Sequence, residues 1–123
     1  ATGAVCGITH LPYGDMYQEE KLVATAKAAV QEGMDVAAKA GVALTYSDPM
    51  DVLELARAGL PYDFKPSILQ SLEKHRPTEV GVINGAVVAQ GAKYGVPTPV
   101  NETLLACVTG IANTLQKNKY SIR

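Results

Sequence analysis

The spacing of apolar residues predicts a chain built from helices. Between about Met16 and Ala40, small and apolar side chains recur at the spacing of one helix face. This segment predicts an amphipathic helix roughly 35 Å long. Gly41 follows it, and glycine commonly ends a helix because it adopts a left-handed conformation without strain. Polar residues recur every fourth position on another face of the same helix, namely Lys27, Gln31, Asp35 and Lys39.

Prolines and capping residues divide the rest of the chain. Pro12 stops an apolar run that begins at Ala1, and Pro12-Tyr13-Gly14-Asp15 has the composition of a turn. Asp48 and Pro49 fit the N-cap and first position of a short helix that ends at Gly59. The other predicted helices run over 1–11, 66–74 and 78–94, and from Thr98-Pro99 towards a frayed end at 117–123.

Signals for β-strands are weak. Residues 42–46 alternate between apolar and polar, but the segment is short and stands alone. Apolar residues make up 47% of the 123-residue chain and charged residues 19%, which is typical of one globular domain. The sequence therefore predicts a single all-α domain over 1–123 with five or six helices. The small residues of the long helix, Ala26, Ala29, Gly33 and Ala37, permit close packing of helices.

Composition excludes several classes of function. The net charge is −1, Trp is absent and Phe occurs once, so we expect no nucleic-acid surface. No apolar run reaches the roughly 20 residues of a membrane span, and no basic leader opens the chain, so we expect a cytoplasmic protein. No cluster with metal-ligand spacing is found, and His10 and His75 are expected at the surface or in caps. Cys6 and Cys107 are expected to be buried free thiols, although a disulfide between them stays open.

Two residues stand out as candidates for chemistry. Glu79 follows Pro77 at a predicted helix start, where the helix dipole favours a negative charge, so its carboxylate is suited to orienting a substrate or a catalytic cation. Ser67 follows Lys65-Pro66 at another helix start, where a hydroxyl and backbone N–H groups can receive a carboxylate. The structural alternative is a first-turn glutamate and a capping serine. Arg76 is expected to be an exposed residue beside the helix.

Three segments in order carry a resemblance to a known family. They are Lys65-Pro66-Ser67-Ile68-Leu69-Gln70, then Arg76-Pro77-Thr78-Glu79 through Asn84-Gly85, then Gly95-Val96-Pro97-Thr98-Pro99-Val100-Asn101. Together they resemble the C-terminal domain of ketopantoate reductase (2-dehydropantoate 2-reductase), from about Leu11 to Val108. The resemblance implies a helical substrate domain of the 6-phosphogluconate-dehydrogenase C-terminal-like type. Asn84 and Asn101 match the motifs, and we expect them at a helix–helix contact and near a helix start.

The resemblance also implies an activity. The family reduces 2-dehydropantoate (ketopantoate) to the 2-hydroxy acid with NADPH, in pantothenate biosynthesis. It implies that Glu79 is catalytic, beside a lysine that lies upstream of Ala1, and that Ser67 binds the substrate. NADPH would be held mainly by the protein's own N-terminal dinucleotide-binding domain, because this chain has no G-x-G-x-x-G motif. The chain alone is expected to be inactive, and a homodimer is possible.

Departures from the family pattern leave the substrate open. The family often has asparagine near Gly3, Tyr13 and Phe64, and their replacement predicts a more apolar pocket around Tyr13 and Phe64. A related 2-keto acid is therefore as compatible with the sequence as ketopantoate. The second interpretation is a non-catalytic helical module, in which the small residues of the long helix form a homodimer contact.

Overall fold

The computed structural model describes residues 1–117, and this part of the chain forms helices without any strand. The all-α prediction is confirmed, but residues 1–117 form seven helices rather than five or six. They are α1 Thr2–Thr9, α2 Tyr13–Gln18, α3 Glu20–Lys39, α4 Pro49–Arg57, α5 Ser67–Glu73, α6 Val80–Tyr94 and α7 Pro99–Lys117. Of the predicted frayed end, only Lys117 is described, and it ends α7; residues 118–123 lie outside the described part.

The additional helix is α2, where the sequence predicts a turn. Its first two amides are paired with a distant segment: Tyr13 N–H donates to the Phe64 carbonyl (2.8 Å) and Gly14 N–H to the Tyr62 carbonyl (2.7 Å). Glu19 then has an extended conformation (φ −92°, ψ 106°), so the long helix predicted from 16 to 40 is divided between α2 and α3. The turn prediction was wrong because the carbonyls of Tyr62 and Phe64, which receive the first amides of α2, are far from it in sequence. Local sequence does not show such a tertiary contact.

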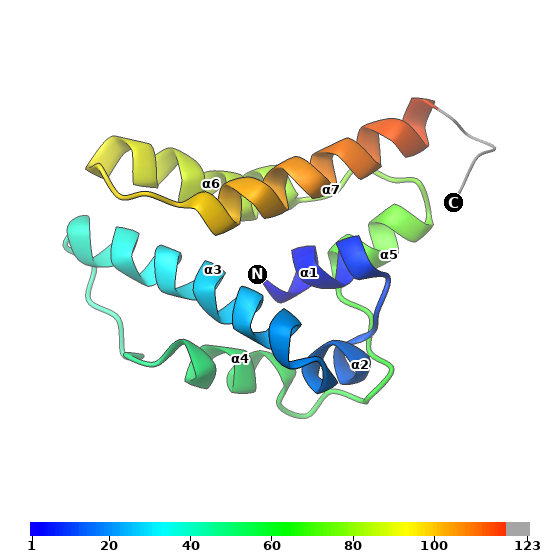
Figure 1. Ribbon diagram of the computed structural model, residues 1–123, viewed down its shortest axis with the longest axis horizontal. Coiled ribbons are helices and arrows are strands. Elements are labelled where there is room, and N and C mark those ends of the chain that lie inside the picture. Colours follow the sequence, from blue (N-terminus) through cyan, green and yellow to red (C-terminus); the bar gives the residue numbers. More distant parts are fainter. Residues whose placement is uncertain (118–123) are drawn as a thin grey trace.

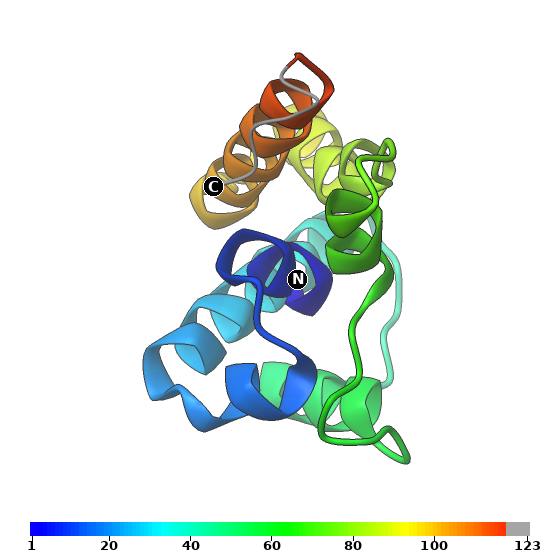
Figure 2. The same cartoon turned by 90° about the vertical axis from the view of Figure 1, so that its right-hand side faces the viewer.

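Helix α1 lies among the other helices of the described chain and packs against α2, α3, α5 and α7. In Figure 1, α6 and α7 lie at the top, α2 and α4 at the bottom, and α1 between them, and Figure 2 shows the same order from the side. Helix α1 carries no charge, and Ala4, Val5 and Cys6 on it are buried. A helix that is apolar on all sides belongs inside a protein, which explains this central position. The largest fully buried apolar side chains of the core are Met16, Leu53, Leu69, Leu72 and Val108.

Helices α1 and α5 approach each other closely. A Cβ atom on Gly7 would lie 2.9 Å from Ile68 Cγ2 and 3.1 Å from Leu72 Cδ1, so only glycine fits there without a shift. A Cβ atom on Gly3 would lie 3.3 Å from Ile68 Cδ1. The first turns of the two helices therefore lie side by side. This packing positions the candidate site described below.

The small residues of α3 are used inside the chain. Ala26 and Ala29 are buried, and a Cβ atom on Gly33 would lie 3.9 Å from Val87 Cγ2 on α6. Helix α3 packs against α4 on one side and against α6 and α7 on the other (Figure 1). The predicted close packing is confirmed. The buried face is not free to form the homodimer contact of the second interpretation.

A buried polar network joins α3, α6 and α7. Asn84 Nδ2 donates to Asn101 Oδ1 (3.0 Å), and Asn101 Nδ2 donates to the Ala29 carbonyl (3.0 Å). The carboxylate of Glu32 accepts from the backbone N–H groups of Val100 and Asn101, at 2.9 Å each. Glu32 therefore caps α7 from another helix. The structural roles expected for Asn84 and Asn101 are confirmed.

Most local helix signals are confirmed. Asp48 Oδ1 accepts from Met50 N–H (2.9 Å) at the start of α4, and Gly41 follows α3 with a φ of +78°. Helix α4 ends at Arg57, two residues before the predicted Gly59.

Among residues 1–117, no helix is long and apolar enough to cross a membrane.

The two cysteines differ in environment. Both are free thiols, and Cys6 is buried as expected, whereas Cys107 is exposed. The prediction was wrong for Cys107 because it lines an open groove between α1, α5 and α7, while Leu104 and Val108 on the same helix are buried in the core. Burial raises the pKa of the Cys6 thiol to about 12.

Candidate functional site

The structure brings Ser67 and Glu79 together. Ser67 is the first residue of α5, and Glu79 immediately precedes α6. The Ser67 hydroxyl donates a hydrogen bond to Glu79 Oε1. Ser67 is exposed and Glu79 is half-buried, so the pair is open to solvent on one side. Both were candidates from the sequence, but their contact was not predicted.

Glu79 does not use its carboxylate to cap its own helix. Helix α6 begins at Val80 rather than at the predicted Thr78, and Glu79 makes no side-chain cap. Thr78 Oγ1 accepts from the Val80 N–H at 3.3 Å instead. The carboxylate is therefore directed to α5. A carboxylate has about four acceptor sites, so bonding to Ser67 leaves Glu79 able to accept from a further donor such as an ammonium group.

Ser67 lies where a helix leaves backbone donors unpaired. Pro66 precedes it in an extended conformation, and the first bond of α5 runs from Gln70 N–H to the Pro66 carbonyl (3.1 Å). The amides of the first turn consequently have no acceptor within the helix. A serine hydroxyl has one proton, and Ser67 gives it to Glu79. Ser67 can donate to a substrate only when this bond is exchanged.

Aromatic side chains meet near the start of α1. The rings of Tyr13 and Phe64, two of the positions where the related family often has asparagine, lie 5.1 Å apart between centroids. The Tyr13 hydroxyl bonds with Thr2 Oγ1 (2.9 Å), and the Tyr13 ring also contacts Tyr17 at 5.6 Å. The pKa of Tyr17 is raised to about 12, mainly because the side chain is buried and to a smaller extent because Tyr13 is close to it. Gly3, the third such position, packs against Ile68.

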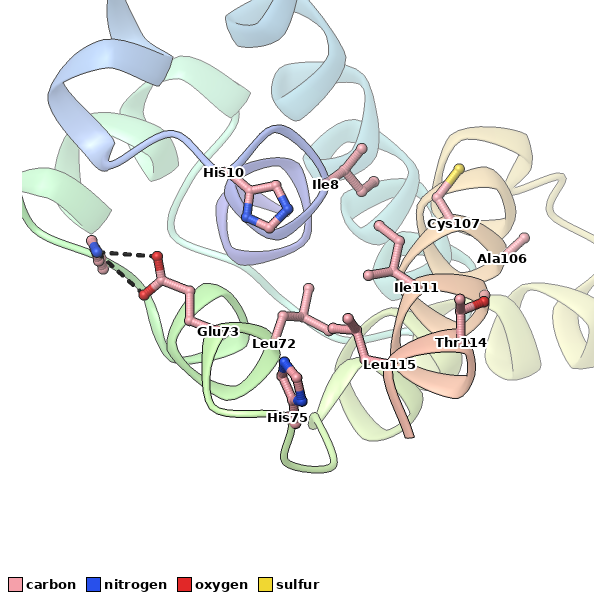
Figure 3. A pocket seen from close by; sticks show the side chains of 12 residues that line it. Ile8, His10, Leu72, Glu73, His75, Ala106, Cys107, Ile111, Thr114 and Leu115 are labelled. Carbon is pink, nitrogen blue, oxygen red and sulfur yellow. Dashed lines mark hydrogen bonds and ion pairs between the residues drawn. The ribbon is translucent and has the colours of Figure 1, made fainter. Parts of the chain in front are cut away.

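A large cavity lies away from the Ser67–Glu79 pair. It is a groove of about 1100 Å³ between α1, α5 and α7 (Figure 3). Its wall is mainly apolar, and the ion pair between Lys65 and Glu73 (3.1 Å) lies at its edge. Neither Ser67 nor Glu79 lines it. Sequence reasoning missed this groove, although Ile111 and Leu115 gave a signal as apolar positions of the last helix.

A metal site has no support within the described chain. Among residues 1–117, no three side chains of His, Cys, Asp or Glu come together to hold an ion. His10, with a φ of 61°, is the C-cap of α1, as expected of a cap residue, and His75, with a φ of 55°, follows Lys74, the C-cap of α5. Arg76 is exposed, also as expected.

Comparison with known proteins assigns the family. A family model described as "Ketopantoate reductase PanE/ApbA C terminal" matches residues 1–112. The chain belongs to this family. The resemblance seen in the three sequence motifs is thereby confirmed, and with it membership of an oxidoreductase family.

Individual relatives agree with this assignment. The 2-dehydropantoate 2-reductase of Archaeoglobus fulgidus is 31% identical over 115 residues, which are 94% of this chain and 38% of that protein. A PanE/ApbA family ketopantoate reductase from Ralstonia eutropha superposes with a TM-score of 0.82 at 30% identity, covering 93% of this chain and 38% of the other. A D-mandelate dehydrogenase solved with NADH and anilino(oxo)acetate has a TM-score of 0.81 at 27% identity, covering 93% of this chain and 48% of the other. The chain therefore spans less than half the length of these relatives.

Proposed function

We propose that this chain is the substrate domain of a reductase that converts a 2-keto acid into the 2-hydroxy acid. The observation that carries the proposal is the bond between Ser67 and Glu79, because it joins the two motif residues to which the family resemblance gives roles in the reaction. They belong to separate helices, and only the fold makes them neighbours. Ketopantoate, in pantothenate biosynthesis, is the substrate that the family's name suggests.

In this proposal Ser67 binds the carboxylate of the keto acid. Its hydroxyl turns from Glu79 to the substrate, and the unpaired amides of the first turn of α5 face the same charge. Glu79 then accepts from the family's catalytic lysine, which would lie upstream of Ala1. The lysine polarises the keto group and supplies the proton as general acid, and Glu79 sets its direction. After this exchange of hydrogen bonds, the substrate carboxylate is bonded to Ser67 and the Glu79 carboxylate to the lysine.

The cofactor is not assigned to this chain. The residues present do not fit a dinucleotide site, because none of the chain's eleven glycines forms the G-x-G-x-x-G loop that receives a pyrophosphate. A nicotinamide cofactor supplies the hydride in such a reaction. We propose NADPH, held mainly by the protein's own N-terminal dinucleotide-binding domain. The possible homodimer stays a prediction.

A turnover screen of the full-length protein tests this function. NADPH and NADH oxidation would be followed with ketopantoate and other branched 2-keto acids, and the 2-hydroxy acid product would be identified. We expect at least one keto acid to be reduced, and faster with NADPH. Failure to reduce any of them with either cofactor, by a protein shown to be folded, would contradict the proposal.

A further inference from the structure

We propose that Tyr62 is a positioning residue for Ser67, the residue that binds the substrate carboxylate in the proposed function. The inference rests on that function, because it names what holds Ser67 in place at the same site. It starts from a close contact between Tyr62, in the connection from α4 to α5, and Gly14 in α2.

Tyr62 is attached to α2 in three ways. Its carbonyl accepts from the Gly14 N–H at 2.7 Å, and its hydroxyl donates to Asp15 Oδ1 at 2.9 Å. Its ring lies over Gly14, where a Cβ atom would be 2.2, 2.3 and 2.4 Å from the ring atoms Cγ, Cδ2 and Cδ1. The ring can occupy this position only because residue 14 has no side chain. Tyr62 is otherwise 58% exposed, so its ring contributes little to the core.

A second bond attaches the same connection to α2. The Tyr13 N–H donates to the Phe64 carbonyl at 2.8 Å. Tyr13 and Gly14 are the first two residues of α2, so their amides have no acceptor within the helix. Two carbonyls of the connection receive these amides, at a helix end that has no side-chain cap. The position of residues 62–64 is therefore set by the start of α2.

The other end of the connection is bonded to α5. Gln70 Nε2 donates to the Lys65 carbonyl at 2.7 Å, and the Gln70 N–H donates to the Pro66 carbonyl at 3.1 Å. Only Lys65 and Pro66 lie between Phe64 and Ser67, and the ring of Pro66 fixes its φ angle. This short segment has little freedom to absorb a displacement of Phe64. Such a displacement would therefore move Ser67.

A movement of Ser67 has a specific consequence in the proposed reaction. Its hydroxyl is bonded to Glu79 and exchanges to the substrate carboxylate, so it must reach both within hydrogen-bond distance. Glu79 precedes α6 and does not belong to this connection, so the direction of the lysine is affected less. We expect a disturbance at Tyr62 to raise KM for the keto acid and to change kcat less.

Steady-state kinetics of the full-length enzyme tests this, with the 2-keto acid that is reduced fastest in the turnover screen. We expect Gly14→Ala, which displaces the ring, to raise KM about 10-fold, the lower end of the effect of losing a hydrogen bond to a charged group. Tyr62→Ala should also raise KM, and Tyr62→Phe, which keeps the ring, should raise it less. Gly110→Ala is the matched control, because no atom would lie within 4 Å of its Cβ.

A double variant separates positioning from a general loss of folded protein. If Tyr62 acts through Ser67, Gly14→Ala should raise KM no further in an enzyme that already carries Ser67→Ala. A further rise of the same size in that enzyme overturns the inference. Wild-type KM values in folded Gly14→Ala and Tyr62→Ala enzymes also overturn it, and both results leave the proposed reductase in place.

A crystal structure of the full-length Gly14→Ala protein gives a readout that needs no substrate. We expect the Ser67 hydroxyl to lose its hydrogen bond to Glu79, and an unchanged bond overturns the inference. Failure of the wild-type enzyme to reduce any 2-keto acid overturns the proposed function, and this structure then decides by itself whether Tyr62 positions Ser67. Tyr62→Ala replaces Gly14→Ala in both measurements if the latter does not fold.

Discussion

At the scale of single residues, the Ser67–Glu79 contact is the feature on which the proposed chemistry depends. Each residue could be selected from its local sequence, because each follows a proline within two residues at a predicted helix start. Their contact depends on the connection after α5, in which His75 has a φ of 55° and the chain turns back. Nothing in the spacing of the sequence fixes that reversal, so the pair emerges only in the fold.

Replacing Ser67 tests its role as a substrate ligand. We expect Ser67→Ala in the full-length enzyme to raise KM by about 10- to 150-fold and to change kcat less, because the substrate carboxylate does not react and keeps its charge from the ground state to the transition state. Ser71→Ala, in the same helix, is the matched control. Steady-state kinetics with saturating cofactor measures the effect. An unchanged KM would leave Ser67 as a helix-start residue.

The buried thiol predicts a pH dependence of stability. The pKa of Cys6 is raised by burial from 9.0 to about 12. Below the lower value the thiol is protonated in both states; between the two values only the unfolded state loses the proton, so stability falls as pH rises. Denaturant unfolding at about pH 7 and pH 10.5 should show a larger loss for the wild-type chain than for Cys6→Ala. Equal losses in the two proteins would contradict this.

At the scale of helices, the sequence predicts where a helix ends better than it predicts which distant residues pair with that end. Asp48 and Gly41 act as their residue types suggest, since these signals are local. Helix α2 and the break at Glu19 were missed because backbone carbonyls of residues 62 and 64 receive the first amides of α2. Helix α7 begins at Pro99, as the Thr98-Pro99 pair predicts, but the carboxylate that receives its first amides belongs to Glu32, far away in sequence.

The turn between α6 and α7 supplies a test at this scale. A Cβ atom on Gly91 would lie 2.7 Å from both the Val96 carbonyl oxygen and Thr98 Cγ2. We expect Gly91→Ala to destabilise the chain by about 1–3 kcal/mol through overpacking. Gly110→Ala is the control: no atom would lie within 4 Å of its Cβ, and alanine should stabilise α7 by about 0.5–1 kcal/mol. Thermal unfolding compares the two, and a Gly91→Ala variant as stable as Gly110→Ala would contradict the packing.

At the scale of the whole molecule, the spacing of apolar residues was sufficient to predict the fold class. It was not sufficient to predict how the helices pack against one another. Helical spacing gave an all-α domain, and the small residues of α3 are buried as expected. The central position of α1 and the groove beside α7 depend on which helix faces pack against each other. The close contact of Gly7 with Ile68 is an example, because it joins segments about 60 residues apart, a distance over which local patterns carry no information.

The chain by itself should fold but not turn over substrate. Its helices bury a core of their own, including Leu69 and Val108. We propose that the cofactor and the catalytic lysine come from another domain of the protein. Circular dichroism of the isolated chain should give a helical spectrum with a cooperative melt. NADPH oxidation with ketopantoate should not exceed the blank. A strand-dominated spectrum, or real turnover, would refute this expectation.

The most direct measurement for the central claim is kcat of Glu79→Gln in the full-length enzyme. Glutamine keeps the length of the side chain and an oxygen that can accept from Ser67, but removes the charge that is proposed to orient the lysine. The account predicts that kcat falls on the order of 10²–10⁴-fold, the scale of acid–base assistance, with little loss of stability. Glu73→Gln, which removes only the exposed pair with Lys65, is the control and should keep its rate. A Glu79→Gln enzyme with wild-type kcat and a stability change of at most about 1 kcal/mol would show that Glu79 is a helix-end charge without a part in the reaction.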